Sequence, residues 1–380
     1  MNKMMSKTKT ALTLLLCFIC SIGFAESDEI SNDLNDNYKY SKKRTIDANF
    51  ESGENHSLYL YGKFSNYKIS TWKENRISFH VDIITKSNKE ETADNLLRQI
   101  DIEFSNLKTN KSVSAKTVLP TKIKNAGFQI DYYIMIPENI FVEIDNSYGD
   151  INIDKLNKYF NIDLDFGDFS IDSIFAACKI DLSYGSAKIK HADEVKGKID
   201  FSDIRINSGE TVDITLKYGN GNFGKIKSLI AKCEFSDITC SEIDNASLNV
   251  KYTDTYLKKV KEATIDNSFS DVEIDHLLKK IKFSSQYGDV EINKVDLDFE
   301  LIDIVSQFSD VEIVLSEEHK FSYNLTATSG DIGNNELKDN AKRYIKEDNK
   351  IMIIGNYNDG SNANQINIEA KYGDIEIDFE

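Results

Sequence analysis

Short runs of alternating apolar and polar residues fill most of this chain, and they recur at a nearly constant interval of 17 to 18 residues. A six-residue phrase marks each copy: an aromatic residue, a small residue, usually Asp, an apolar residue, any residue, and a second apolar residue. One copy reads Tyr148-Gly149-Asp150-Ile151-Asn152-Ile153. The aromatic residues that open the regular copies are Tyr148, Phe166, Tyr184, Phe201, Tyr218, Phe235, Tyr252, Phe269, Tyr287 and Phe308, with weaker copies at Ser329 and Tyr372 and an early one at Phe64.

Numbering each copy from its aromatic residue as position 0 shows which positions are apolar. Positions −4 and −2, as at Ile162 and Leu164, and positions +3 and +5, as at Phe169 and Ile171, are mostly apolar. Alternation with a period of two is typical of strands with one buried face. The apolar residues occupy even-numbered positions before the Gly-Asp pair, odd-numbered positions after it, and an even-numbered position again at +8. These two changes predict two bends per copy, where Gly, Ser, Asn and Asp favour turns.

A unit of this length cannot bury its own apolar face, so copies are expected to stack on one another. We therefore predict an all-β fold: a single-stranded β-solenoid (β-helix) with about 17–18 residues per coil and about 4.8 Å between neighbouring coils. The alternative is a long antiparallel meander. The strict alternation of Tyr and Phe at position 0 favours that alternative, because alternate turns of a meander lie at opposite ends.

The rest of the chain predicts the following organisation. Residues 1–25 have the charged start, apolar run and small-residue cleavage site of a signal peptide, which predicts an exported protein, periplasmic, cell-surface or extracellular, with no integral membrane segment after cleavage. The remaining segments are a flexible acidic leader at 26–43, an N-terminal β-rich cap region at 44–140, the β-solenoid at 141–332, a polar insertion at 333–363 and a final solenoid coil at 364–380. The insertion is expected to leave the rod as a hairpin or loop.

The cap region has weaker periodicity than the repeats. Strands are expected at 76–85 and near 100–104, 112–119 and 128–136. One short amphipathic helix is expected, in which Ala93, Leu96, Leu97 and Ile100 recur at helical spacing. Asn88 is its expected N-cap and Glu91 its capping-box partner. Such a cap would close the exposed end of a stack of strands.

The net charge of −17 and the pI of about 4.9 argue against nucleic acid as a partner, because nucleic-acid binding needs basic patches. Three cysteines remain after removal of the signal peptide: Cys178, Cys233 and Cys240. All three fall in apolar columns of the repeat, and Cys178 lies three coils from the other two, too far for a disulfide. We therefore interpret them as buried small hydrophobic residues.

Position +2 is almost always acidic. The column comprises Asp150, Asp168, Asp203, Asp237, Asp254, Asp271, Asp289, Asp310 and Asp374, with Ser186 and Asn220 as substitutes. One interpretation is a structural turn column in which each Asp accepts hydrogen bonds from corner amides. The other is a ladder of calcium ions between coils, which would make the protein a calcium-stabilised structural module.

A second acidic group lies just before the corners of the first coils, at Asp145, Asp163, Asp165 and Asp181. It is either a solvated face, a site for one metal ion, or the carboxylate set of a polysaccharide-acting β-helix enzyme. The five histidines fall in unrelated columns, and no Ser-His-Asp arrangement, phosphate-binding Gly loop or HExxH motif is present. We therefore expect no catalytic, cofactor-binding or metal-binding residues and a non-enzymatic protein.

Three phrases carry a resemblance to a known group of proteins: Tyr148-Gly149-Asp150-Ile151, Phe269-Ser270-Asp271-Val272 and Ser329-Gly330-Asp331-Ile332. Behind a signal peptide, they resemble the "putative adhesin" families of secreted bacterial proteins, including those named for the head GIN domain of auto-transporter adhesins. The resemblance implies a β-solenoid outside the cytoplasm and an adhesin-like or interaction scaffold, with an unknown protein or glycan partner of the cell envelope. It brings no catalytic residues.

Overall fold

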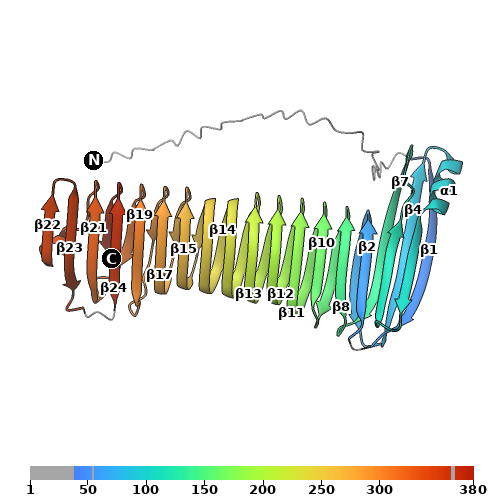
Figure 1. The fold of residues 1–380 in the computed structure, drawn as a ribbon, viewed down its shortest axis with the longest axis horizontal. Helices are drawn as coiled ribbons and strands as arrows, with labels where there is room; N and C mark the ends of the chain where they lie inside the picture. The colour runs from blue at the N-terminus through green and yellow to red at the C-terminus, as the bar shows by residue number, and fades with distance from the viewer. Residues whose placement is uncertain (1–37, 54, 361–363) are drawn as a thin grey trace.

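The computed structural model describes residues 38–53, 55–360 and 364–380. The protein is all-β, an open and elongated sheet structure in which strands stand side by side from β1 at one end to β22 at the other (Figure 1). Among the described residues only α1 and α2 are helical. The expected signal peptide lies outside the described residues. β1 (Tyr40–Glu51) begins inside the expected leader, so residues 40–43 belong to the sheet.

Two parallel ladders run through the repeat region. Ladder A consists of the strands that lead into each aromatic corner, and ladder B of the strands that leave it. In most copies a residue pairs with the residue 17 or 18 positions later, as Ile162 with Ile180 and Ile180 with Gly197, and the spacing widens to 21 between Phe283 and Ile304. Because every pairing between these copies is parallel, the antiparallel meander is wrong. Two bends per copy return the chain to the same edge, so all aromatic corners lie on one side.

The strand bounds show how the ladders are assembled. In ladder A lie β8 (Phe141–Ser147), β10 (Phe160–Asp165), β15 (Val260–Ser268), β17 (Leu277–Gln286), β19 (Leu301–Gln307), β24 (Gln365–Lys371) and β21 (Phe321–Thr328). In ladder B lie β3 (Ser65–Trp72), β9 (Ile151–Leu156), β16 (Val272–Ile274), β18 (Val290–Ile292), β20 (Val311–Leu315) and β25 (Ile375–Phe379). Four longer strands bend through both ladders: β11 (Asp168–Ser183), β12 (Ser186–Asp200), β13 (Asp203–Lys217) and β14 (Asn220–Leu257).

The core lies between the two ladders and is built from the predicted apolar columns. Ile162 and Leu164 from ladder A, and Phe169 and Ile171 from ladder B, are all at most 2% exposed. The three cysteines are free and buried in this core, which confirms the interpretation of them as small hydrophobic residues.

Each corner needs a small residue directly after its aromatic residue. At Gly149, φ is +146°, and an added Cβ would lie 2.3 Å from the backbone oxygen of Ser65 in the neighbouring copy. At Gly219 an added Cβ would lie 1.8 Å from the backbone oxygen of Ser202. Neighbouring corners therefore approach backbone to backbone, which excludes larger side chains from position +1.

The N-terminal region continues both ladders and then adds antiparallel strands to the end of each. β2 (Ser57–Lys63) pairs in parallel with β8 and with β6 (Ser112–Val118), and β5 (Asp101–Leu107) pairs antiparallel with β6. In ladder B, β3 pairs in parallel with β7 (Ala126–Pro137), which is followed by antiparallel β4 (Arg76–Ser87) and β1. β4, β5, β6 and β7 lie where the sequence predicted strands, whereas β1 was not predicted and begins inside the expected leader.

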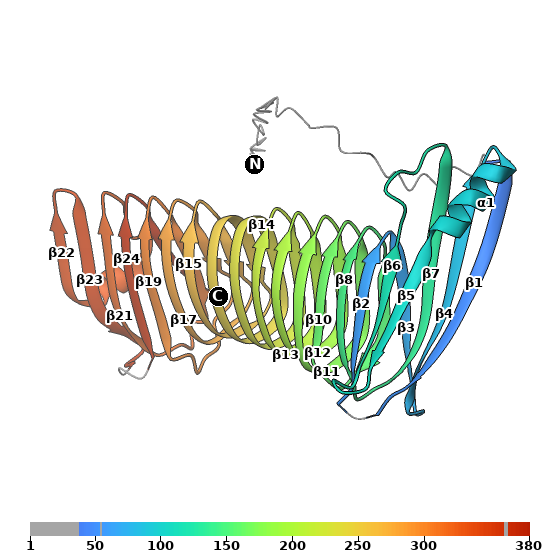
Figure 2. The ribbon, with the colours of Figure 1, turned by 45° about the vertical axis from the view of Figure 1, so that its right-hand side comes forward.

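The helix α1 (Glu90–Gln99) packs on β1 and β4 at this end of the molecule (Figure 2). Its existence confirms the prediction, but the expected N-cap is wrong. The N-cap residue is Lys89, which makes no capping hydrogen bond through its side chain. The Oδ1 atom of Asn88 instead accepts the backbone N–H of Lys39, at the start of β1, at 3.3 Å. This tertiary contact occupies the acceptor that a cap would use.

At the C-terminal end the order in space departs from the order in sequence. β24 of the final copy lies between β19 and β21, although it follows β21 in the chain. The insertion forms α2 (Asn335–Asp339), β22 (Ala341–Glu347) and β23 (Lys350–Tyr357). The two strands form a hairpin, as expected, but it does not leave the rod. β23 pairs antiparallel with β21 and extends ladder A, because its alternating Ile351, Ile353 and Tyr357 continue the buried face.

Candidate functional site

Successive corners bring their aromatic rings into one continuous stack, which we call the aromatic strip. Neighbouring ring centroids lie 4.6–5.2 Å apart, and the ring planes differ by 0–18°. Twelve rings take part, so the strip is about 50 Å long at one ring per strand spacing. The rings belong to Phe64, Tyr148, Phe166, Tyr184, Phe201, Tyr218, Phe235, Tyr252, Phe269, Tyr287, Phe308 and Tyr372.

The strip is exposed along nearly its whole length. Phe64, at the N-terminal end, is 7% exposed and packs edge to face on Phe128, but the other eleven residues are 39–51% exposed. Each inner ring has both faces covered by its neighbours. The surface offered to a partner is therefore a row of ring edges and Tyr hydroxyl groups rather than open ring faces.

The backbone of these residues adopts a conformation that disfavours bulky side chains. At all twelve positions φ is between 50° and 64°, the left-handed region. That region costs an ordinary L-residue roughly 1–2 kcal/mol, and Asn or Gly would occupy it at lower cost. A stacked aromatic pair contributes about 0.5–1.5 kcal/mol beyond its buried area, so stacking offsets part of the backbone cost.

The aspartates of position +2 form a second column, two residues along the chain from the strip. An Asp side-chain oxygen accepts the backbone N–H of the equivalent residue in the next copy: Asp168 to Asp150 at 3.0 Å, and Asp289 to Asp271 at 3.0 Å. The same contact holds for Ser186, Asn220, Asp271, Asp310, Asp374 and Asp331 as donors. Corner amides are thus the donors, as the turn interpretation predicted, but each amide belongs to the next copy.

The aspartate column is exposed to solvent at all nine predicted positions. Among the residues that the structure describes, no group of three or more His, Cys, Asp or Glu side chains has the arrangement of a metal site. One carboxylate oxygen of most column members is already engaged by an amide, which reduces the repulsion between stacked carboxylates. These side-chain-to-backbone hydrogen bonds link each copy to the next, as the backbone hydrogen bonds of the two ladders do.

The structure also brings together the acidic group near the first corners. Asp145, Asp163 and Asp181 are direct partners across β8, β10 and β11, and Asp165 lies two residues farther along the same face. Partial burial raises the pKa of Asp163, and the neighbouring carboxylates of Asp181 and Asp145 raise it further. We call these four residues the acidic patch.

The structure also shows a second acidic row, which the sequence pattern did not predict. Position +4 carries Glu273, Glu291, Glu312 and Glu376, which are consecutive partners in ladder B. Partial burial and then the charges of Glu291 and Glu376 raise the pKa of Glu312. The sequence does contain this row as four Glu residues at position +4. They were not singled out because they alternate with the apolar residues at positions +3 and +5, as solvent-facing residues of a strand do.

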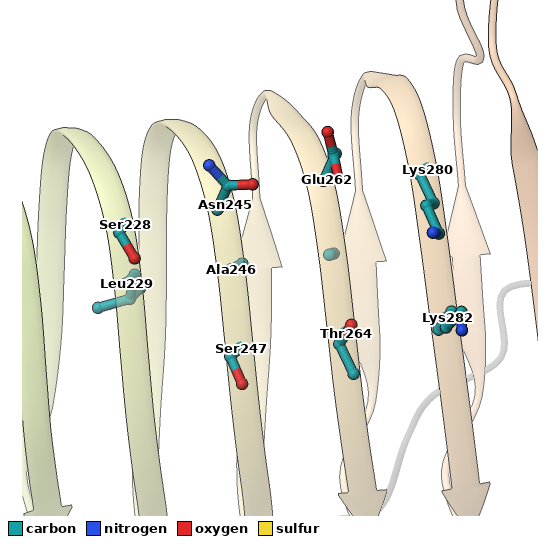
Figure 3. A pocket seen from close by; sticks show the side chains of 10 residues that line it. Ser228, Leu229, Asn245, Ala246, Ser247, Glu262, Thr264, Lys280 and Lys282 are labelled. Carbon is teal, nitrogen blue, oxygen red and sulfur yellow. The ribbon is translucent and has the colours of Figure 1, made fainter.

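The concave features among the described residues include shallow grooves between strands. One, of about 270 Å³, lies on the outer face of ladder A, where short side chains such as Ser228, Ser247 and Thr264 leave a dip beside Glu262 and Lys280 (Figure 3). Its side chains come from successive copies and contain no nucleophile–base pair. The groove lies away from the corners and shares no residue with the aromatic strip.

The chain is similar to several solved structures at low sequence identity. No family model and no curated protein matches the chain. Among solved structures, similarity is found to a putative cell adhesion protein from Clostridium sporogenes, with 15% identity over 89% of this chain and 100% of that one and a TM-score of 0.22. A putative adhesin from Bacteroides fragilis has 14% identity over 66% of this chain and 97% of that one, with a TM-score of 0.32. A putative lipid binding protein from Parabacteroides distasonis has 10% identity over 72% and 96%, with a TM-score of 0.28.

All three TM-scores are below 0.5 and all three identities are below 25%. No helix within the described residues is long and apolar enough to span a membrane.

Proposed function

We propose that the chain is a non-enzymatic β-solenoid that acts outside the cytoplasm as an adhesin-like interaction scaffold. Its binding surface is the aromatic strip, and its partner is a protein or glycan of the cell envelope. One observation carries this proposal: eleven aromatic residues stay 39–51% exposed in an unbroken row, although none of them is needed to fill the core.

The chemistry of the strip fits recognition. Contiguous exposed apolar surface marks interaction sites in soluble proteins, and aromatic side chains dominate the energetics of binding interfaces. The rings are held by stacking and by the ladders on either side, so little side-chain entropy remains to be lost on binding. A regular row of equivalent corners also offers several contacts to one extended partner, which raises avidity without raising the affinity of any single contact.

A matched pair of variants tests the proposal. The strip variant carries Tyr218→Asn, Phe235→Asn and Tyr252→Asn, because Asn tolerates the left-handed backbone. The control variant carries Phe175→Asn, which removes an aromatic ring that is 46% exposed but lies outside the strip. Circular dichroism confirms folding of both variants.

The measurement is binding of the purified proteins to intact cells, to arrayed envelope glycans and to isolated envelope proteins. We expect the wild-type and control proteins to bind one of these targets and the strip variant to lose at least about tenfold in affinity. Equal binding by the strip variant, or no binding by the wild-type protein to any of the targets, would overturn the proposal.

A second candidate function has one observation in its favour. A carboxyl group whose pKa is raised beside ionised carboxylates is the arrangement that glycoside hydrolysis uses, and Asp163 in the acidic patch has such a pKa. A polysaccharide-acting enzyme would then use Asp163 as the acid and Asp145 or Asp181 as its partner. Incubation of the protein with a broad panel of polysaccharides tests for this activity. Release of reducing ends by the wild-type protein, lost in Asp163→Asn, would establish this activity, and no release from any substrate would remove it.

A further inference from the structure

Ladder A has an open edge at each end of the molecule. At the N-terminal end the edge strand is β5, which pairs only with β6 among the described strands. At the other end it is β22, which pairs only with β23 (Figure 1). Both strands are seven residues long. Each therefore presents a row of unpaired backbone N–H and C=O groups to one side, which is a template for pairing with another strand.

The two edges carry opposite charge. β5 exposes Asp101 and Glu103, of which Asp101 already lies 3.6 Å from the guanidinium of Arg44 in β1, whereas β22 exposes Lys342, Arg343, Lys346 and Glu347. Within the described part of the chain, neither Lys342 nor Arg343 forms an ion pair or a side-chain hydrogen bond. The edge strand of ladder B at the N-terminal end differs in this respect. Its basic residues are already paired with acidic groups of the same molecule, as in the contact of 2.9 Å between Lys43 and Asp82.

The directions of the two edge strands are compatible. The repeat strands of ladder A all run the same way, and β6 runs with them, so antiparallel β5 runs against them. β23 runs against the repeat strands, so β22 runs with them. A β22 strand placed beside the β5 strand of another copy would therefore form an antiparallel pair, the pairing in which opposed side chains lie closest.

From these features we propose that copies of this protein associate head to tail, with β22 of one copy adding to β5 of the next. The pairing continues ladder A across the junction and sets Arg343 of β22 against Glu103 of β5. Because the two edges lie at opposite ends of an elongated molecule, the contact is heterologous and generates an open chain of copies rather than a closed dimer. This inference is independent of the proposed function, since the aromatic strip is not part of either edge.

The competing explanation for the basic residues of β22 is protection of the edge. Charged side chains, and Lys above all, discourage strand addition in natural sheets. The two explanations predict opposite results. Protection predicts a monomer at every concentration, whereas head-to-tail pairing predicts growth of the particle with concentration and loss of that growth at high salt.

Charge reversal provides the decisive experiment. In Arg343→Glu the residues at positions 343 and 103 are both acidic, and in Glu103→Arg they are both basic, so each variant alone should associate more weakly. Mixed in equal amounts, the variants again present opposite charges at every junction, and alternating chains should form. Lys188→Glu, which changes an exposed residue on the side of the rod, is the control and should associate like the wild-type protein.

Sedimentation velocity of the mature proteins measures the outcome, with circular dichroism to confirm that each variant is folded. We expect concentration-dependent oligomers for wild-type protein and control, at least about tenfold weaker association for each reversed variant, and recovery in the mixture. A wild-type protein that stays monomeric, a closed dimer, or a mixture that fails to recover association would each overturn the proposal.

Discussion

The stacking of the aromatic strip makes a quantitative prediction that two chemically matched tyrosines can test. Tyr252 stacks on Phe235 at 4.8 Å and on Phe269 at 5.0 Å. Tyr372 is the last ring of the strip and stacks only on Phe308, at 4.8 Å. The two positions are otherwise alike. Their φ angles are 51° and 59°, their exposures are 43% and 47%, and the amino group of the preceding Lys lies 5.4 and 5.2 Å from the ring centroid.

Replacement of either tyrosine by Asn relaxes the same backbone strain and removes the same contact with the Lys side chain. The difference between Tyr252→Asn and Tyr372→Asn therefore isolates one stacked pair. We expect Tyr252→Asn to cost about 0.5–1.5 kcal/mol more free energy of unfolding than Tyr372→Asn.

Urea denaturation followed by circular dichroism measures both variants. The comparison requires an unchanged m-value, because a stack of repeats can unfold in parts. An equal cost for the two variants, or a larger cost for Tyr372→Asn, would refute the claim that stacking stabilises the corners.

Three further results are expected. Asp168→Ala should lower the melting temperature by about 2–4 °C, because the backbone N–H of Ser186 in the next copy loses its acceptor. Asp168→Asn should lower the melting temperature less. Calcium should not shift the melting temperature of either variant or of the wild-type protein. A shift of several degrees in calcium would show that the column binds the ion. The thiols of Cys178, Cys233 and Cys240 should resist iodoacetamide until the protein unfolds, because burial raises the pKa of each thiol, that of Cys233 to about 12. Labelling of the folded protein as fast as that of an exposed thiol would contradict their place in the core. Because the raised pKa of Asp163 means that the folded state binds its proton more tightly than the unfolded state, this group favours folding as the pH falls through that pKa towards 3.8. Asp163→Asn should therefore melt higher than the wild-type protein at pH 7, and the gap should close near pH 4; a gap independent of pH would exclude this cause.

Much of the repeat architecture was predictable from the sequence because every copy has the same alternation of apolar and polar residues. The apolar columns, the bends and the burial of Cys178 all follow from a register set on the aromatic residues, and the structure has them as expected. The alternation of Tyr and Phe favoured a meander because alternate turns of a meander lie at opposite ends, whereas the two bends per copy argued against it. Once both bends are included, every ring returns to the same side, and the alternation becomes a stack of unlike rings.

The contacts that were not predictable join residues far apart in the chain. The side-chain oxygen of Asn88 accepts the backbone N–H of Lys39, which lies just before β1 and far from Asn88 in the chain, so the local capping pattern did not decide the cap. Similarly, the place of β24 between β19 and β21 depends on which strand best covers the open side of β21, and the hairpin strand β23 takes the other side. The candidate binding surface was visible in the sequence only as a column of aromatic residues. Its exposure and stacking required the corner geometry.

The parallel, in-register stack of copies is the claim on which the strip, the aspartate column and the assembly all depend, and engineered disulfides test it most directly. Lys188 of β12 and Arg205 of β13 are exposed direct partners in the ladder, so their Cα atoms are expected about 4.8 Å apart, within the range a disulfide spans. Asn222 is the next partner in the same row, about 10 Å from Lys188.

The account predicts that Lys188→Cys combined with Arg205→Cys forms a disulfide rapidly on mild oxidation of the folded protein, seen as the loss of two hydrogen masses and of two reactive thiols. Lys188→Cys combined with Asn222→Cys should stay reduced under the same conditions. A first pair that stays reduced, or two pairs that oxidise equally well, would contradict the stack.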